Sequence, residues 1–166
     1  MKETDIYDIK DNVVELIGKE WMLITAGSIE NFNTMTASWG NMGFLWGKPV
    51  VTVYVRPQRY TLEFLEREEC FTLSFFSGKY REALNICGTK SGRDTDKVAE
   101  SGLTPYSPAD GTVSFEEARM VMKCRKLYKG KLGEEEFIDK SLLLKWYPQR
   151  DLHYVYIAEI EKVWVG

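Results

Sequence analysis

Residues 50–61 read VVTVYVRPQRYT, and this stretch decides the fold class. Its first six residues are all β-branched or aromatic, a composition typical of a buried strand. Arg56 and Pro57 end that strand, because a proline cannot donate to a sheet hydrogen bond. The apolar spacing from Arg59 to Glu66 then predicts a short helix. The stretch is therefore interpreted as a strand, a tight turn and a helix.

The same strand signature recurs along the chain. Further strands are predicted at residues 21–26, 70–76, 119–128 and 154–165, and short helices at residues 80–86, 94–101 and 134–146. The last of these segments is ambiguous, since it is acidic at its start and apolar only later. Many strands with a few short helices between them indicate a mainly β protein, and they favour a small β-barrel over a sandwich. We expect one domain, residues 1–166, whose core begins at about residue 13.

Charge and composition exclude several classes of protein. There are 22 basic and 25 acidic residues and the net charge is −3, so neither a nucleic acid nor a membrane is expected as a partner. Aromatic residues make up 13% of the chain, which is too many for a disordered protein. No apolar run has the length of a membrane span, and no signal peptide is visible at the acidic start. Three widely spaced cysteines favour free thiols in a reducing cytoplasm.

Several catalytic motifs are missing from the sequence. His153 is the single histidine and the cysteines lie far apart, so we expect no protein-bound metal. The sequence contains no G-x-S-x-G turn, no P-loop and no G-x-G-x-x-G turn. Redox or group-transfer chemistry would therefore need a bound organic cofactor.

Residues 31–41, NFNTMTASWGN, form the first segment that could bind a ligand. If the segment is extended, Thr34, Thr36 and Ser38 share one face and offer three hydroxyls. Met35, Ala37 and Trp39 share the other face and would pack inward. Hydroxyls beside small residues would let a planar polar ligand approach the backbone. An ordinary strand with one wet face is the alternative.

Two cationic segments follow. Arg56, Arg59 and Thr61 lie where a strand ends and a helix begins, and arginine forks together with helix N–H groups bind phosphate well. A proline turn with solvated arginines explains the same pattern. The loop at residues 88–97, GTKSGRDTDK, offers further cations and hydroxyls to a phosphate, although it also has the composition of an ordinary exposed loop.

Taken in order, four polar segments resemble the flavin reductase-like family, and within it the flavoredoxin-type branch. They are NTMTAS at 33–38, RPQRYT at 56–61, SGRDTDK at 91–97 and DLHYVYIAEI at 151–160. The resemblance extends from about Trp21 to Val163. It implies an FMN-binding split β-barrel that forms a homodimer, with the flavin near the subunit interface.

The resemblance also implies roles for individual residues. The implied cofactor-binding residues are Asn33, Thr34, Met35, Thr36, Ala37, Ser38, Arg56, Arg59, Tyr60, Thr61, Ser91 and Lys97. His153 matches a family histidine near the flavin ring and is the catalytic candidate, as a hydrogen-bond donor or acceptor rather than a base. A histidine that only packs at the entry to the last strand is the alternative. The segment from Lys129 to Trp146 is interpreted as an insertion that alters access to the flavin.

The resemblance implies an oxidoreductase with bound FMN, because flavin N5 accepts a hydride without help from a metal or nucleophile. We expect an NAD(P)H-dependent reductase that passes electrons to free flavin or to a redox protein partner. One alternative is a flavoredoxin-like electron carrier with tightly bound FMN and little NAD(P)H turnover. Another is a flavin- or haem-binding barrel without turnover. The sequence does not distinguish NADH from NADPH.

Overall fold

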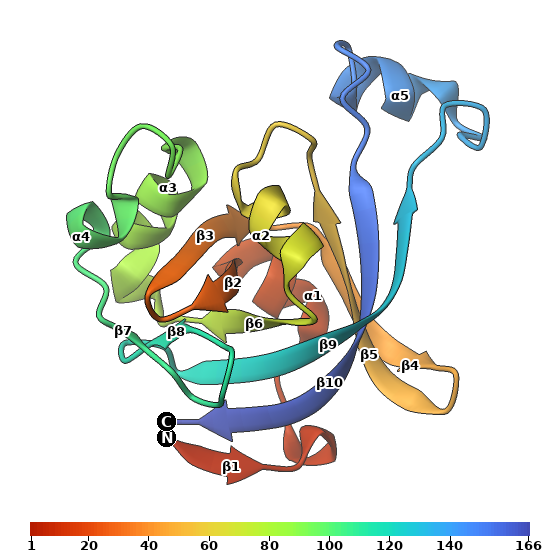
Figure 1. Cartoon of the computed structure of the whole chain (residues 1–166). Coiled ribbons are helices and arrows are strands. Elements are labelled where there is room, and N and C mark those ends of the chain that lie inside the picture. The colour runs from red at the N-terminus through yellow and green to blue at the C-terminus, as the bar shows by residue number, and fades with distance from the viewer.

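The computed structural model describes residues 1–166, and most strands belong to one curved sheet (Figure 1). The strands of this sheet are β1 (Lys2–Thr4), β2 (Met22–Ser28), β3 (Asn31–Ala37), β4 (Gly40–Leu45), β5 (Lys48–Val55), β6 (Cys70–Phe75), β9 (Met120–Lys131) and β10 (Tyr154–Val165). A separate two-stranded sheet contains β7 (Pro105–Tyr106) and β8 (Ser114–Phe115).

The connection between β3 and β4 forces the sheet to curl. The strand order is β3-β2-β6-β9-β10-β5-β4, and β1 pairs with β10. Only Ser38 and Trp39 lie between β3 and β4, although these strands stand at opposite ends of the order. The three Cα–Cα steps from Ala37 to Gly40 span at most about 11 Å, so the two ends must meet. No ladder joins β3 to β4, and the predicted mainly β split barrel is confirmed.

The strands expected from composition are all present, with small shifts at their ends. They are β2, β5, β6, β9 and β10. β9 continues to Lys131, so residues 129–131 belong to the strand and not to the inserted segment. Register shifts between β9 and β10 occur near Ile157 and Ile160, where extra residues bend the pair and help the sheet to curl.

Two of the expected helices are confirmed with small shifts at their ends, and two are shorter than predicted. They are α2 (Thr61–Arg67), α3 (Arg81–Thr89), α4 (Lys97–Ser101) and α5 (Lys140–Trp146). α4 begins at Lys97 rather than 94, because the Asp96 side chain accepts a hydrogen bond from the Ala99 N–H and caps the helix. Asp139 caps α5 in the same way, which excludes residues 134–139 from the helix. The short α1 (Val13–Glu15) was not predicted.

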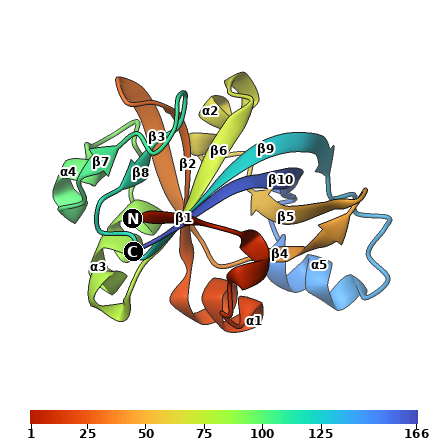
Figure 2. The ribbon, with the colours of Figure 1, turned by 90° about the horizontal axis from the view of Figure 1, so that it is seen from below.

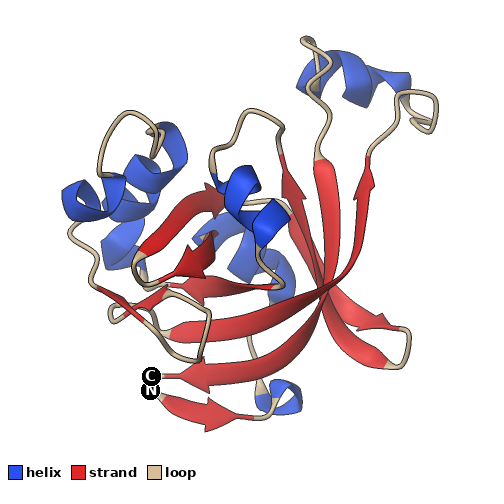
Figure 3. Ribbon diagram, in the orientation of Figure 1, coloured by secondary structure: helices blue, strands red, loops and turns tan.

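The barrel interior holds one large apolar core of aliphatic, methionine and phenylalanine side chains. A second core lies between the sheet and α3, where Leu23 of β2 packs near Leu84 of the helix. Figure 3 distinguishes the short helices from the strands by colour, and Figure 2 shows α3 and α4 on the side of the barrel away from α5. None of the helices is long and apolar enough to cross a membrane.

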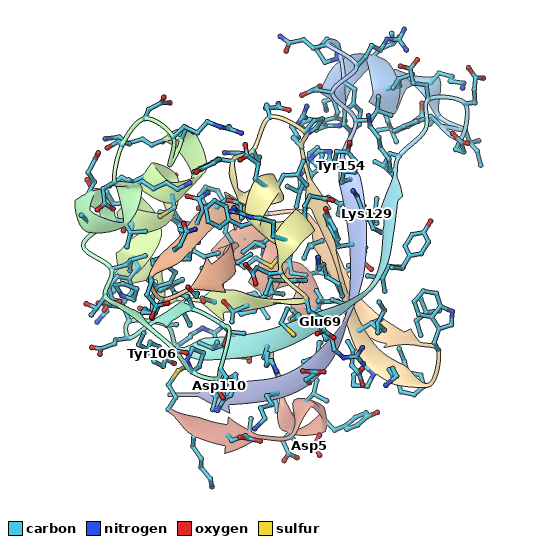
Figure 4. All side chains as sticks on the ribbon, viewed as in Figure 1. Asp5, Glu69, Tyr106, Asp110, Lys129 and Tyr154 are labelled. Atoms are coloured by element: carbon cyan, nitrogen blue, oxygen red, sulfur yellow. The ribbon has the colours of Figure 1, made fainter.

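Residues 132–153, which link β9 to β10, form an arm that carries α5 away from the barrel (Figure 1). The arm has its own small core of Leu143, Tyr147 and Leu152. At its base, the Lys129 ammonium lies 4.9 Å from the centre of the Tyr154 ring, and Figure 4 shows both side chains where β9 and β10 meet the arm. The arm is therefore a small packed unit rather than a loose loop.

Candidate functional site

A groove follows β3 at the open edge of the sheet. It consists of two adjoining cavities of about 220 and 160 Å³ that share Met35, Arg56 and Arg59. The cationic end is lined by Met35, Arg56, Gln58, Arg59, Tyr60, Thr61, Thr89, Lys90, Ser91 and Lys97. The aromatic end is lined by Met35, Thr36, Ala37, Ser38, Trp39, Tyr54, Arg56, Arg59, Trp146 and His153. The structure thus brings the second and third predicted segments to one end, and the first segment and His153 to the other.

The edge position of β3 explains why consecutive residues line the aromatic end. Met35, Thr36, Ala37 and Ser38 all line it, although side chains of a strand alternate between two faces. β3 pairs with β2 on one side only, so its other edge is unpaired. Backbone N–H and C=O groups along that edge are available to a flat ligand.

Two of the three hydroxyls predicted to face a ligand, those of Thr34 and Thr36, bond to the protein instead. The Thr34 hydroxyl is buried 2.8 Å from the Thr25 hydroxyl and donates to the Ile24 carbonyl, so it faces the adjacent strand. The Thr36 hydroxyl donates to the Leu84 carbonyl of α3. Trp39, predicted to pack inward, is 37% exposed because β3 ends two residues earlier and the chain turns there.

Arg59 and Lys97 make the cationic end unusual, because neither has a carboxylate partner within salt-bridge distance. Arg59 donates to the Gly88 carbonyl at 2.6 Å. The Lys97 ammonium lies 3.4 Å from each of two backbone carbonyls, those of Cys87 and Lys90, and the residue is 4% exposed. Neutral carbonyls leave both charges uncompensated.

Burial perturbs both of these cations. Desolvation lowers the pKa of Lys97 to about 8, and repulsion from the Arg59 guanidinium contributes to the shift. The pKa of the Arg59 guanidinium is also lowered, by burial first and by Arg56 second. An anion bound between Arg59 and Lys97 would relieve both effects.

Polar neighbours complete the cationic end. The Asn33 side chain donates to the buried Thr61 hydroxyl at 2.7 Å and so fixes the start of α2 against β3. Asn33 does not line the groove and instead lines a neighbouring cavity with Arg93 and Lys97. The Ser91 hydroxyl accepts the Arg93 N–H at 3.2 Å, and Tyr60 is covered by the Arg93 guanidinium 4.6 Å above its ring.

Arg56 differs from Arg59, because residues of the arm already engage it. Its guanidinium forms a salt bridge with Asp151 and donates to the Trp146 carbonyl at 2.9 Å. It also lies 5.1 Å from the centre of the Tyr147 ring. Gln58 donates to the same Asp151 carboxylate at 2.9 Å. Arg56 therefore clamps the arm to the barrel, and Arg59 is the arginine left for an anion.

The aromatic end is built from residues far apart in the sequence. The Trp39 ring lies 5.1 Å from both the Trp146 ring and the His153 ring. Tyr54 of β5 meets His153 edge-on at 6.4 Å. Sequence reasoning missed Trp39, Tyr54 and Trp146 as groove residues, since no local pattern joins them.

The arm holds His153 in place. The Tyr147 hydroxyl lies 2.7 Å from His153 Nδ1, and both residues are buried. Burial lowers the pKa of His153 to about 4, and the Arg56 charge adds to this effect. The imidazole is therefore neutral at pH 7. When Tyr147 donates to Nδ1, the ring proton sits on Nε2 and can be donated to a ligand.

Comparison with known families shows which family the chain belongs to. Residues 15–166 match the model of the flavin reductase-like domain. The chain belongs to the flavin reductase-like family. The resemblance seen in the sequence is thus confirmed, and nearly the whole barrel, with the arm, lies inside the matched region.

Solved structures show the family fold at low sequence identity. An FMN-binding domain of a flavin reductases-like enzyme from Shewanella baltica is 17% identical with a TM-score of 0.70, covering 98% of this chain and 75% of that one. Flavoredoxin of Desulfovibrio vulgaris is 22% identical with a TM-score of 0.67, covering 88% and 69%. The NADH:FAD oxidoreductase SgcE6 of Streptomyces globisporus is 14% identical with a TM-score of 0.67, covering 89% and 75%. No curated protein sequence matches the chain.

Proposed function

We propose that the groove binds FMN, with the phosphate at the cationic end and the isoalloxazine ring at the aromatic end. The observation that carries the proposal is the pair of cations that lack an acidic partner, the half-buried Arg59 and the buried Lys97. A phosphate between them would gain charge-assisted hydrogen bonds and neutralise both groups. Ser91 and Thr61 line the same cavity and offer hydroxyls to the remaining phosphate oxygens.

The aromatic end suits a flat heterocycle. The unpaired edge of β3 presents backbone groups along Thr36 to Ser38. The Trp39 ring and the His153 imidazole stand at the far end of these residues. A planar ring with polar edges can hydrogen-bond to the backbone and pack against the aromatic side chains. The Shewanella and Desulfovibrio relatives support flavin as that ring.

We propose that the protein is an NAD(P)H-dependent flavin oxidoreductase. Bound FMN would supply the hydride-accepting chemistry, and the chain would bind, orient and polarise it. Neutral His153 would donate from Nε2 to the nicotinamide carboxamide or to the reduced ring. Tyr147 would hold the imidazole at the required angle, and Trp146 over Trp39 would restrict water at that end.

The visible spectrum of the purified protein tests this function. We expect the absorption bands of oxidised flavin, release of FMN rather than FAD on denaturation, and bleaching by NADH or NADPH under anaerobic conditions. Bound flavin that neither nucleotide bleaches would identify an electron carrier instead. Failure to bind any flavin on reconstitution would overturn the proposal.

His153 has its own test within this function. Replacing it with alanine should slow hydride transfer about ten- to a hundredfold, the scale of one or two hydrogen bonds in the transition state. FMN affinity should change little, because the cationic end is intact. Stopped-flow bleaching at saturating nucleotide measures the rate. An unchanged rate would leave His153 a packing residue.

We further propose a homodimer. Phe44, Leu45 and Trp46 at the turn between β4 and β5 are 65%, 39% and 57% exposed, and together they form an apolar tip. Such a tip is typical of a surface covered by a partner. Free thiols at all three cysteines fit the reducing cytoplasm that we propose as its setting.

A further inference from the structure

A further cavity lies beside the aromatic end of the groove, outside the proposed flavin site. Its volume is about 710 Å³, in the range of small-molecule sites. Its walls come from α1 and the residues that follow it, the start of β4, and the arm. None of its lining residues carries a charge, and Val13, Ile17 and Met42 give it an apolar floor.

The cavity adjoins the groove. Ser38, Trp39 and Tyr54 line both. A molecule in the cavity would therefore touch the same side chains as the flavin ring does on our proposal. Tyr147, which holds His153, also lines the cavity.

Hydrogen-bond donors are available on one wall. The Tyr54 hydroxyl donates to Asn41 Oδ1 at 3.0 Å, which fixes the Asn41 amide with its Nδ2 group unused. The Ser38 hydroxyl is a second donor. Two donors beside aromatic rings, in a cavity without charge, match a flat neutral molecule with carbonyl oxygens.

We propose that this cavity is the electron-acceptor site and that its substrates are neutral aromatic quinones. The inference rests on the proposed function, since the flavin must first be reduced by a nicotinamide. The quinone would gain one hydride from the reduced flavin and one proton from solvent. Two O–H bonds form, the hydroquinone leaves, and the flavin returns to its oxidised state. Overall, NAD(P)H and a proton reduce one quinone.

Charge excludes the obvious competitors. Free FMN and dinucleotides carry phosphates, and the cavity has no cation to receive them. Lys97 lies at the cationic end of the groove, and Arg56 and Arg59 line both ends of the groove but not the cavity. A second copy of the chain would need to insert an apolar segment here, which is a separate outcome of the test below.

The test compares 1,4-naphthoquinone with its 2-sulfonate in two variants. Asn41→Asp keeps an oxygen that accepts from the Tyr54 hydroxyl, but it replaces the free Nδ2 donor with a second, negatively charged oxygen. Asn31→Asp is the control, because it makes the same change at an exposed site away from the cavity. We expect the neutral quinone to quench tryptophan fluorescence of the apoprotein and the sulfonate to bind at least tenfold more weakly. Asn41→Asp should weaken neutral-quinone binding and raise its KM about tenfold or more, while Asn31→Asp should match wild type.

The readouts separate failure of this site from failure of the flavin proposal. FMN affinity and bleaching by the nicotinamide report on the flavin alone, and quenching of the apoprotein reports on the cavity alone. Equal binding of both quinones, or an unchanged response in Asn41→Asp, would overturn the acceptor site. If the quinone does not quench the apoprotein and Asn41→Asp changes the oligomeric state, the cavity binds a second copy of the chain. That result would also overturn the acceptor site.

Discussion

Replacing Lys97 with methionine should raise stability and lower flavin affinity at once. Methionine keeps much of the length and apolar volume of lysine but removes the charge. In the folded apoprotein the pKa of Lys97 falls from 10.5 to about 8, which corresponds to about 3 kcal/mol of unfavourable free energy at pH 7. The apoprotein of the Lys97→Met variant should therefore unfold at higher urea concentration, by up to that free energy.

The same substitution should weaken FMN binding. Loss of one charge-assisted contact to a buried phosphate costs about 1.5–3 kcal/mol, or roughly ten- to a hundredfold in affinity. Riboflavin lacks the phosphate, so its affinity should stay the same. Fluorescence titration with both ligands measures this, and Lys79→Met, at an exposed lysine, is the matched control.

The pH dependence has a definite sign. Between pH 8 and 10.5 the unfolded chain keeps a proton on Lys97 that the folded apoprotein has released, so stability rises with pH in this interval. FMN affinity should fall over the same interval, because the folded protein loses the cation. Both slopes should flatten in Lys97→Met. Lower stability of this variant, or equal losses for FMN and riboflavin, would refute the reasoning.

Three further predictions follow from the same contacts. Arg59→Ala should weaken FMN binding about ten- to a hundredfold and leave riboflavin binding unchanged, whereas Arg56→Ala should mainly free the arm, seen as faster tryptic cleavage at Lys140 and Lys145. His153 has its pKa lowered from 6.5 to about 4, so stability should fall by up to about 3 kcal/mol as pH decreases through that interval, and urea unfolding of His153→Gln should lack this component. Trp46→Asp should shift a dimer to monomer in sedimentation at micromolar concentration while FMN stays bound, and a monomeric wild type would contradict the dimer.

The strands could be predicted where burial and β-propensity coincide. β5 is a continuous run of β-branched and aromatic residues from Val50 to Val55, and β10 begins with such a run from Tyr154 to Ile157, and such runs are visible in a single sequence. β4 was missed because it contains two glycines and mostly exposed side chains, so its sequence carries no strand signal. Its extended conformation depends on its pairing with β5. The predicted start of α5 was wrong because the Asp139 cap, and not the apolar spacing, fixes where the helix begins.

Residue type indicated the cationic end of the site, but the choice between the arginines depends on contacts across the fold. Arg56 and Arg59 are three residues apart and look alike in the sequence. Asp151, 95 residues further along the chain, neutralises Arg56 and leaves Arg59 unpaired. The aromatic end was harder still, because Trp39 and Trp146 meet only after β3, β4 and the arm have assembled.

The two-residue link between β3 and β4 connects the fold to the proposed chemistry. Ser38 and Trp39 close the barrel, because they join strands at opposite ends of the sheet order. The same two residues line both the groove and the uncharged cavity. Any ligand in the groove and any ligand in the cavity must therefore approach each other at Trp39. If the flavin ring occupies the first and the acceptor the second, barrel closure itself brings donor and acceptor together, and no moving domain is needed to join them.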